Sequence, residues 1–438
     1  MIKLGSKGSL RQHLIRAASG SFIIKLLNTV FTLLIAVVLA RVLGADGFGV
    51  YAFCFSISQV LAVPAMLGMQ QLVVREVSAY RTREEYSLIR GLLRRSRQNV
   101  FLASLALMIV AGIIAFLVAE YIDAMNLSAF WMAMLLVPLF AFLRVHNSAL
   151  RGFGRIIQGQ LGRVLRPAFF LILIGVLFFF FPSRLDPLHA LSMHVIGATL
   201  ALGILCYLLQ KALPFQTKIS KPEYRTRIWM KSAWPMLLAG GMQILNKETS
   251  VLMLGFLGTA EDVGFFRVAQ RAAILIPFGL HAVNMALAPT ASRLYTNGQI
   301  QLLQRVLTQS ARAILAYALP VTLCLMIGSF WLVPLIFGSE FVPAIWPLII
   351  LCAGQLVNAG VGSVGIVLTM TQNERLTAKG VVIAAIVNLI LNIILIPLWG
   401  TLGAAVATSI SIILWNCLLA LWLYQKLGVT TTVINKIK

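Results

Sequence analysis

The chain has 438 residues, of which 60% are hydrophobic and only 11% are charged. A soluble domain carries about 25% charged residues, so this composition excludes an ordinary soluble protein and indicates that the bilayer is the solvent. The formal net charge of +23 would suggest a nucleic-acid partner in a soluble protein. Here the basic residues gather in alternate polar loops and form no nucleic-acid motif, so we expect no such partner.

Apolar blocks about 20 residues long, enough to cross a hydrocarbon core about 30 Å thick, recur along the whole chain. The first 20 residues are basic and weakly amphipathic, which predicts an interfacial helix before an uncleaved first span. Pro277 predicts a kink in the eighth span. We predict an all-α membrane protein with twelve transmembrane helices, at residues 21–43, 48–70, 98–119, 129–150, 167–182, 187–210, 232–256, 262–288, 311–336, 343–370, 377–397 and 402–425.

The loops between these spans alternate in charge. One set holds 29 of the 36 Lys and Arg residues, whereas the opposite set holds only Arg184. By the positive-inside rule, both termini and the basic loops lie in the cytoplasm. The longest basic loop, residues 75–97, is predicted to form a helix on the anionic inner leaflet. The basic set comprises residues 1–20, 71–97, 151–166, 211–231, 289–312, 371–379 and 426–438.

The chain divides into two halves of six spans, residues 1–213 and 214–438. A similar phrase occurs near the second span of each half, LARVLGADGFGVYAF and LGFLGTAEDVGFFRVA, in which Gly49 matches Gly264. An even number of spans gives both halves the same orientation in the membrane. We therefore predict two pseudo-symmetric six-helix bundles around a central cleft, with the interfacial helix belonging to the first.

These phrases, together with GMQQLVVREVSAY, APTASRLY and IPLWGTLGAAVATSIS, resemble the oligosaccharide flippase (polysaccharide transporter) family. This family belongs to the multidrug/oligosaccharidyl-lipid/polysaccharide exporter superfamily, and twelve spans resemble its O-antigen flippases. The resemblance implies transport of undecaprenyl-pyrophosphate-linked oligosaccharide across the bacterial inner membrane by alternating access, for surface polysaccharides such as lipopolysaccharide. It also implies membrane lipids, a polysaccharide polymerase and chain-length proteins as partners.

One departure from the family concerns the seventh span. Related proteins carry an acidic residue there, upstream of the Leu-Gly pair that is Leu254-Gly255 in this chain. Ser250 occupies that place, and Glu248 is the nearest carboxylate. We keep Glu248 as a candidate coupling or ion-pair residue and do not carry over a cation-coupling site.

Basic residues within spans are costly, about 2.5–3.5 kcal/mol each at mid-membrane on insertion scales, so they usually face a partner or a watery cavity. Arg41 lies near the outer end of its span, where snorkelling explains it, with Asp46 as a partner. Arg144 lies toward the inner end of its span, where snorkelling and a functional role both stay open. Four others are deeper in the predicted spans. Lys25 shares a helix face with Asn28, and Arg267 shares one with Arg271.

We predict that a cationic cleft holds the substrate pyrophosphate, because the guanidinium fork fits phosphate oxygens. The alternative is a structural ion-pair network between the halves, in which Glu248 pairs with Arg271 or Lys25. The predicted substrate-binding residues are Lys25, Asn28, Lys247, Arg267 and Arg271.

The remaining polar motifs point to no catalytic chemistry. The string RGFGRIIQG, residues 151–159, fits no phosphate-binding loop, and the histidines lack zinc-ligand spacing. Asn388 and Asn392 are predicted to join helices by hydrogen bonds. We expect a transporter rather than an enzyme, without cofactor or metal, driven by an ion gradient or the membrane potential. Two alternatives stay open: a small-molecule or multidrug exporter of the same superfamily, and a non-transporting scaffold for a polysaccharide-synthesis complex.

Overall fold

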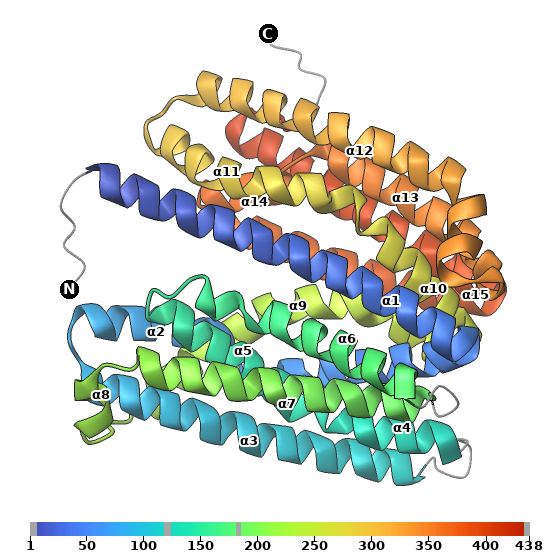
Figure 1. Cartoon of the computed structure of the whole chain (residues 1–438). Coiled ribbons are helices and arrows are strands. Elements are labelled where there is room, and N and C mark those ends of the chain that lie inside the picture. The colour runs from blue at the N-terminus through green and yellow to red at the C-terminus, as the bar shows by residue number, and fades with distance from the viewer. Residues whose placement is uncertain (1–6, 118–123, 181–184, 433–438) are drawn as a thin grey trace. The chain divides into compact units, whose positions relative to one another are not determined.

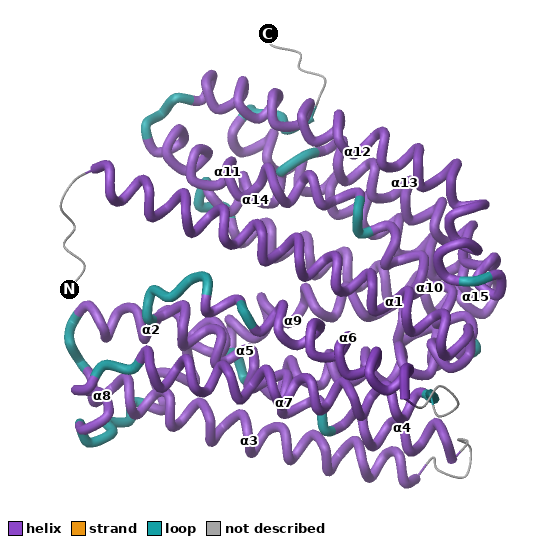
Figure 2. Tube along the Cα trace, viewed as in Figure 1, coloured by secondary structure: helices purple, strands orange, loops and turns teal. Residues whose placement is uncertain are grey.

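The structure is a computed structural model that describes residues 7–117, 124–180 and 185–432. Every element within these ranges is a helix, and no strand occurs among them, which confirms the all-α fold (Figure 1). The loops that join the helices are short (Figure 2). Arg184 and the first six residues of the predicted interfacial helix lie outside the described residues.

The helices follow one another with few interruptions, and several predicted spans appear as one helix or as two helices in succession. In chain order they are α1 (Lys7–Ala65), α2 (Met69–Thr82), α3 (Tyr86–Leu117), α4 (Ala124–Met134), α5 (Leu136–Gly152), the 3-10 turn η2 (Gln158–Gln160), α6 (Gly162–Phe180), α7 (Pro187–Ala212), α8 (Phe215–Ile219), α9 (Thr226–Leu257), α10 (Ala260–Ala273), α11 (Ile276–Thr296), α12 (Ile300–Phe337), the 3-10 turn η4 (Ser339–Ala344), α13 (Ile345–Val361), α14 (Val364–Met370) and α15 (Glu374–Leu427).

The two longest helices, α1 and α15, each contain a break at a glycine. They have 59 and 54 residues. At 1.5 Å per residue this is about 80–90 Å, far more than a hydrocarbon core of about 30 Å. Gly44 has φ 69° and Gly400 has φ 53°, a left-handed conformation that glycine adopts without steric cost. Each break lies between two of the predicted spans.

Eight described helices are long and apolar enough to cross a membrane, or up to nine if α10 and α11 count as one span. The α10–α11 pair bends by 45°, and Pro277 stands in the first turn of α11, close to the predicted kink. The chain is therefore a multi-pass membrane protein. The count of twelve spans and the cytoplasmic position of the termini stay predictions.

By its internal contacts the chain forms two compact units. The first contains Met1–Ile35 and Cys54–Ile244, and the second contains Ala36–Phe53 and Leu245–Lys438. The chain thus passes between units twice within α1 and once within α9. The predicted division into halves at residue 213 stays a prediction.

The first unit packs α5 against α2, α3 and α7, and α6 against α7. Its basic segment 75–97 is divided between α2 and α3 rather than forming one surface helix. Tyr80 and Leu92 are only 4% and 0% exposed, and the Tyr80 hydroxyl accepts a hydrogen bond of 3.0 Å from Trp229 Nε1. The prediction of a single helix lying on the inner leaflet is wrong, because its apolar face is buried in protein.

The second unit contains a close helix crossing at the two matched glycines. A Cβ atom on Gly49 would lie 1.7 Å from the carbonyl oxygen of Ala260, and one on Gly264 would lie 2.5 Å from that of Ala45. Each glycine therefore contacts the residue four positions before its counterpart. This reciprocal contact brings the second segment of α1 against α10.

Candidate functional site

The polar residues deep in the second unit come mainly from α9 and α10. A capping box fixes where α10 begins: Thr259 Oγ1 accepts from the Asp262 N–H at 3.2 Å, and the Asp262 carboxylate accepts from the Thr259 N–H at 3.1 Å. From this start, the helical period places Arg267 and Arg271 on one face. This face of α10 packs against α9, where the neighbouring residues begin at Lys247.

The centre of this group is a buried ion pair. Arg267 Nη2 lies 2.9 Å from Glu248 Oε2, and the two side chains are 3% and 6% exposed. The same guanidinium donates to Gln270 Oε1 at 2.9 Å and to the Ala52 carbonyl at 3.4 Å. Protein acceptors thus surround Arg267. This geometry favours the structural alternative for Arg267, and its partner Glu248 differs from the pairings predicted for that carboxylate.

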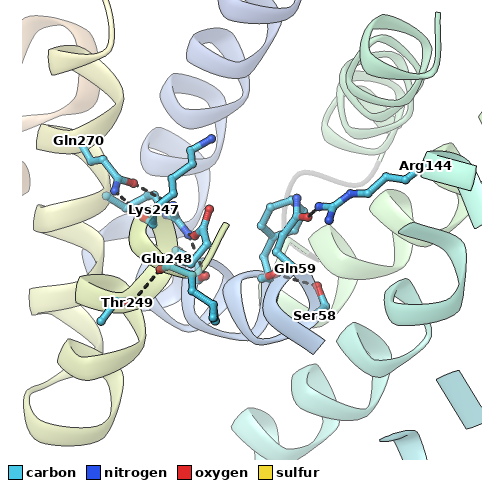
Figure 3. A network of polar contacts seen from close by, with 11 residues as sticks. Ser58, Gln59, Arg144, Lys247, Glu248, Thr249 and Gln270 are labelled. Carbon is cyan, nitrogen blue, oxygen red and sulfur yellow. Dashed lines mark hydrogen bonds and ion pairs between the residues drawn. The ribbon is translucent and has the colours of Figure 1, made fainter. Parts of the chain in front are cut away.

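Two further cations lie near the Arg267–Glu248 pair. Lys247 and Arg271 both lie close enough to act on the Glu248 charge. Lys247 is exposed and Arg271 is half-buried, while Gln270 Nε2 donates to the Lys247 carbonyl at 3.1 Å and so joins α10 to α9. Figure 3 shows Lys247, Glu248 and Gln270 gathered where these helices meet. Three cations around one carboxylate leave the cluster, Lys247, Glu248, Arg267 and Arg271, with a net positive charge.

A second polar network lies beside Ser250, the residue at the position of the family acid. Its hydroxyl lies 2.8 Å from Thr408 Oγ1 and accepts from Asn392 Nδ2 at 3.1 Å. Asn392 also donates to the carbonyl of Asn388 at 2.7 Å. The predicted role in joining helices is confirmed for Asn392, which links α15 to α9, whereas Asn388 bonds to Asn392 of its own helix. Sequence reasoning did not identify Thr408, whose only signal was a hydroxyl in an apolar span.

Lys25 and Asn28 lie in the first unit, on α1, and both are half-buried. The carbonyl of Lys25 accepts from Thr29 Oγ1 at 3.0 Å, and that of Asn28 accepts from Thr32 Oγ1 at 2.5 Å. Of Lys25 and Asn28, these bonds use only the backbone carbonyls. The polar ends of Lys25 and Asn28 are not engaged by them.

The structure gives Arg41 and Arg144 protein partners, and their snorkelling stays a prediction. Arg41 donates to the carbonyls of Leu335 and Ile336 at the end of α12, the latter at 2.8 Å. The predicted partner, Asp46, takes no part in these two bonds. Arg144 donates to Gln59 Oε1, a contact drawn in Figure 3. Gln59 was another functional candidate that the sequence did not reveal.

The part of the chain that the structure describes offers no group of metal-binding side chains. Among the residues that the structure describes, no three His, Cys, Asp or Glu side chains come together in a way that could hold a metal ion. The clusters contain cations, amides and hydroxyls, which bind anions and polar groups. Such groups can recognise an anionic or polar ligand.

Comparison with known proteins gives two kinds of similarity. The family model described as polysaccharide biosynthesis protein matches residues 14–295, well over half the chain. A probable low-salt glycan biosynthesis flippase, Agl15 of Haloferax volcanii, is 30% identical over 161 residues, or 37% of this chain and 34% of that protein. The probable flippase AglR of the same organism is 29% identical over 171 residues. The alignments thus cover about a third of each relative.

Solved structures share the fold at low identity. An inward-facing MATE-family multidrug resistance transporter has a TM-score of 0.71 and 13% identity, covering 92% of this chain and 94% of that one. The lipid II flippase MurJ, in an inward closed conformation, has a TM-score of 0.70 and 15% identity, covering 93% and 87%. The chain shares the polytopic fold of these two membrane proteins, and it belongs to the polysaccharide biosynthesis protein family.

Proposed function

We propose that the protein is a flippase that moves a lipid-linked oligosaccharide across a membrane for glycan biosynthesis. The observation that carries this proposal is the net positive cluster of α9 and α10, deep in the second unit of a multi-pass protein. A positive site between helices of a membrane protein suits an anionic head group, and a lipid-linked sugar carries its charge at the phosphate that joins lipid to glycan. Relatives named as flippases support the same role.

The finer parts of the proposal come from the family resemblance and the loop charges. The carrier is undecaprenyl pyrophosphate, the membrane is the bacterial inner membrane, and both termini are cytoplasmic. The product serves a surface polysaccharide of the O-antigen type, and a polymerase and chain-length proteins act on it afterward. Transport occurs by alternating access between two six-helix halves. Ion gradients or the membrane potential supply the energy.

Within the cluster we assign different roles to the cations. Lys247 is exposed and Arg271 is half-buried, so their head groups are the ones that contact the phosphate oxygens. Arg267 is buried against Glu248 and positions α10 relative to α9. This assignment separates the predicted binding residues into two that touch the substrate and one that supports them. Lys25 and Asn28 of the first unit stay proposed substrate contacts.

Reconstitution tests the proposal. Purified protein in liposomes, supplied with a fluorescent lipid-pyrophosphate-linked oligosaccharide, should carry label to the opposite leaflet. The Arg271→Gln variant should lose about tenfold or more of this rate, because one charge-assisted contact to phosphate is removed. Arg305→Gln, at an exposed arginine of α12, is the matched control and should transport normally.

Three results would contradict the proposal. Full transport by a folded Arg271→Gln protein would remove the role of that residue in binding. Movement of a cationic dye instead of the lipid-linked sugar would indicate a drug exporter. No movement of either compound by folded protein would favour the scaffold alternative.

A further inference from the structure

The glycine- and arginine-containing turn after α5 has no role in the proposed function. It runs from Arg151 through η2 to Arg163 at the start of α6. Two glycines let this turn pack tightly onto α5: a Cβ atom on Gly159 would lie 2.6 Å from the Asn147 carbonyl oxygen, and one on Gly162 would lie 2.8 Å from the Asn147 side chain. The turn is therefore held in a defined place against α5.

The same turn is attached to α1. Gln160 Nε2 donates to Ser21 Oγ at 2.7 Å. Lys25 follows Ser21 by four residues, and Arg163 follows Gln160 by three. Lys25 therefore lies on the same helix face as Ser21, and Arg163 lies on the same face as Gln160. The hydrogen bond thus brings Lys25 alongside Arg163, and their positive charges act on each other.

A third cation completes the group. Arg151 also lies close enough for its charge to act on Arg163. One of its guanidinium nitrogens, Nη2, donates to Ser148 Oγ at 2.9 Å. Its Nε is buried and has no hydrogen-bond partner among the described residues. Lys25, Arg151 and Arg163, here called the α1–α6 cluster, therefore concentrate positive charge and retain donor capacity.

Carboxylates do not balance this charge locally. The sequence contains no Asp or Glu before Asp46 and none from residue 124 to residue 185, which covers these segments of α1, α5 and α6. On α2, which packs against α5, Glu76 pairs with Arg75 at 2.7 Å. The ion-pair explanation that applies to Arg267 thus has no counterpart in the α1–α6 cluster. Bringing three like charges together is unfavourable unless an anion joins them.

We propose that the α1–α6 cluster is a loading site for the pyrophosphate of a membrane-borne lipid, an inference that rests on the proposed flippase function. The loop charges predict this end of the helices to be cytoplasmic, where a lipid-linked sugar would enter. Arg144 lies seven residues before Arg151 on the same face of α5, and Asn28 lies three after Lys25 on α1. These residues continue the polar face from the loading site along each helix.

Binding to full-length protein in phosphatidylcholine nanodiscs tests the site, with a fluorescent prenyl pyrophosphate as the probe. Arg163→Gln should weaken binding about tenfold, the value of one charge-assisted contact, whereas Arg163→Lys should retain most of it. The matched control is Arg155→Gln, an exposed arginine of the same turn that contacts Gln158 at 3.2 Å, and it should bind within twofold of wild type.

Two competitors identify the ligand. Inorganic pyrophosphate should displace the probe, because the site recognises the two-phosphate group. Phosphatidylglycerol at an equal concentration should not. Equal displacement by phosphatidylglycerol would overturn the assignment in favour of bulk anionic lipid. Unchanged affinity in Arg163→Gln, or an equal loss in Arg155→Gln, would overturn the site itself.

A double-mutant cycle over Lys25→Gln and Arg163→Gln tests whether both residues hold one ligand. Residues that share a ligand should give non-additive losses, and independent residues should give additive ones, which would separate Lys25 from the site. Failure of this inference is distinguishable from failure of the proposed function. If Arg163→Gln flips the lipid at the wild-type rate and binds the probe with unchanged affinity, only the loading site is disproved. If probe binding depends on Arg163 but the wild-type protein flips no lipid, only the proposed flippase function is disproved.

Discussion

The two cationic clusters of this protein differ in one respect: the α9–α10 cluster contains a carboxylate and the α1–α6 cluster does not. In the first, Glu248 takes a buried hydrogen-bonded contact from Arg267 at 2.9 Å, and Lys247 and Arg271 lie around this pair. In the second, Lys25, Arg151 and Arg163 oppose one another without a local acid. Whether an intramembrane arginine is a structural residue or a binding residue therefore depends on its partner.

The physical consequence concerns what each cluster needs to be stable. A buried pair is costly to break, because the remaining charge stays in a medium of low dielectric constant without compensation. A group of like charges near an aqueous end is instead relieved when one of them is removed. The same substitution, a charge changed to an amide, should therefore have opposite effects on the stability of the two units.

The largest expected effect is in the buried pair. Glu248→Gln should lower the free energy of unfolding by about 3–5 kcal/mol, because Arg267 would keep its charge in a buried place without its carboxylate. Thermal unfolding of the detergent-solubilised protein, followed by tryptophan fluorescence, measures this change. The double variant Glu248→Gln/Arg267→Met should recover much of the loss. If Glu248→Gln alone unfolds at the wild-type temperature, the pair does not hold α9 and α10 together.

The next effect concerns the glycine crossing that brings α1 against α10. Gly49→Ala should destabilise by about 1–3 kcal/mol, because the new methyl group would meet a backbone carbonyl that cannot move aside like a side chain. Gly203→Ala on α7 is the matched control, since a Cβ atom there has nothing within 4 Å. Equal unfolding midpoints for the two variants would show that α1 and α10 can move apart at the crossing without loss of stability.

Much of the fold followed from the sequence because apolar block length and glycine placement are local signals. The breaks of α1 and α15 at Gly44 and Gly400 occur between predicted spans for this reason. Helical periodicity also placed Arg267 and Arg271 on one face. It could not show that one is buried in a pair and the other half-buried, because that depends on where α9 crosses α10.

Partners distant in sequence were likewise beyond prediction. The sequence suggested Asp46 for Arg41, five residues away, whereas the structure gives carbonyl oxygens of α12 about 295 positions along the chain. Ser250, noted only as a departure from the family, proved to bond with Asn392 and Thr408. Hydrogen bonds to backbone and hydroxyl groups leave little trace in one sequence, since neither residue type nor spacing identifies the acceptor.

A smaller effect is expected in this Ser250 network. Asn392→Leu should cost about 0.5–1.5 kcal/mol, because interhelical hydrogen bonds within membranes contribute little more than this. The same unfolding assay measures it, and Ser411→Ala is the control, since the Ser411 hydroxyl bonds to the Ala407 carbonyl of its own helix at 2.7 Å. A loss as large as that of Glu248→Gln would mean that the network holds α15 against α9 as strongly as the ion pair holds α10 against α9.

The smallest effect returns to the α1–α6 cluster and has the opposite sign. Without ligand, Arg163→Gln should leave the unfolding midpoint unchanged or raise it slightly, by up to about 0.5 kcal/mol, because it removes repulsion from Lys25 and Arg151. Added prenyl pyrophosphate should then stabilise the wild type more than the variant, because only the state that binds ligand gains from it. Destabilisation of the unliganded variant by more than about 1 kcal/mol would mean that Arg163 has a structural partner. The two clusters would then be alike, and the missing carboxylate would no longer distinguish a binding site from a structural one.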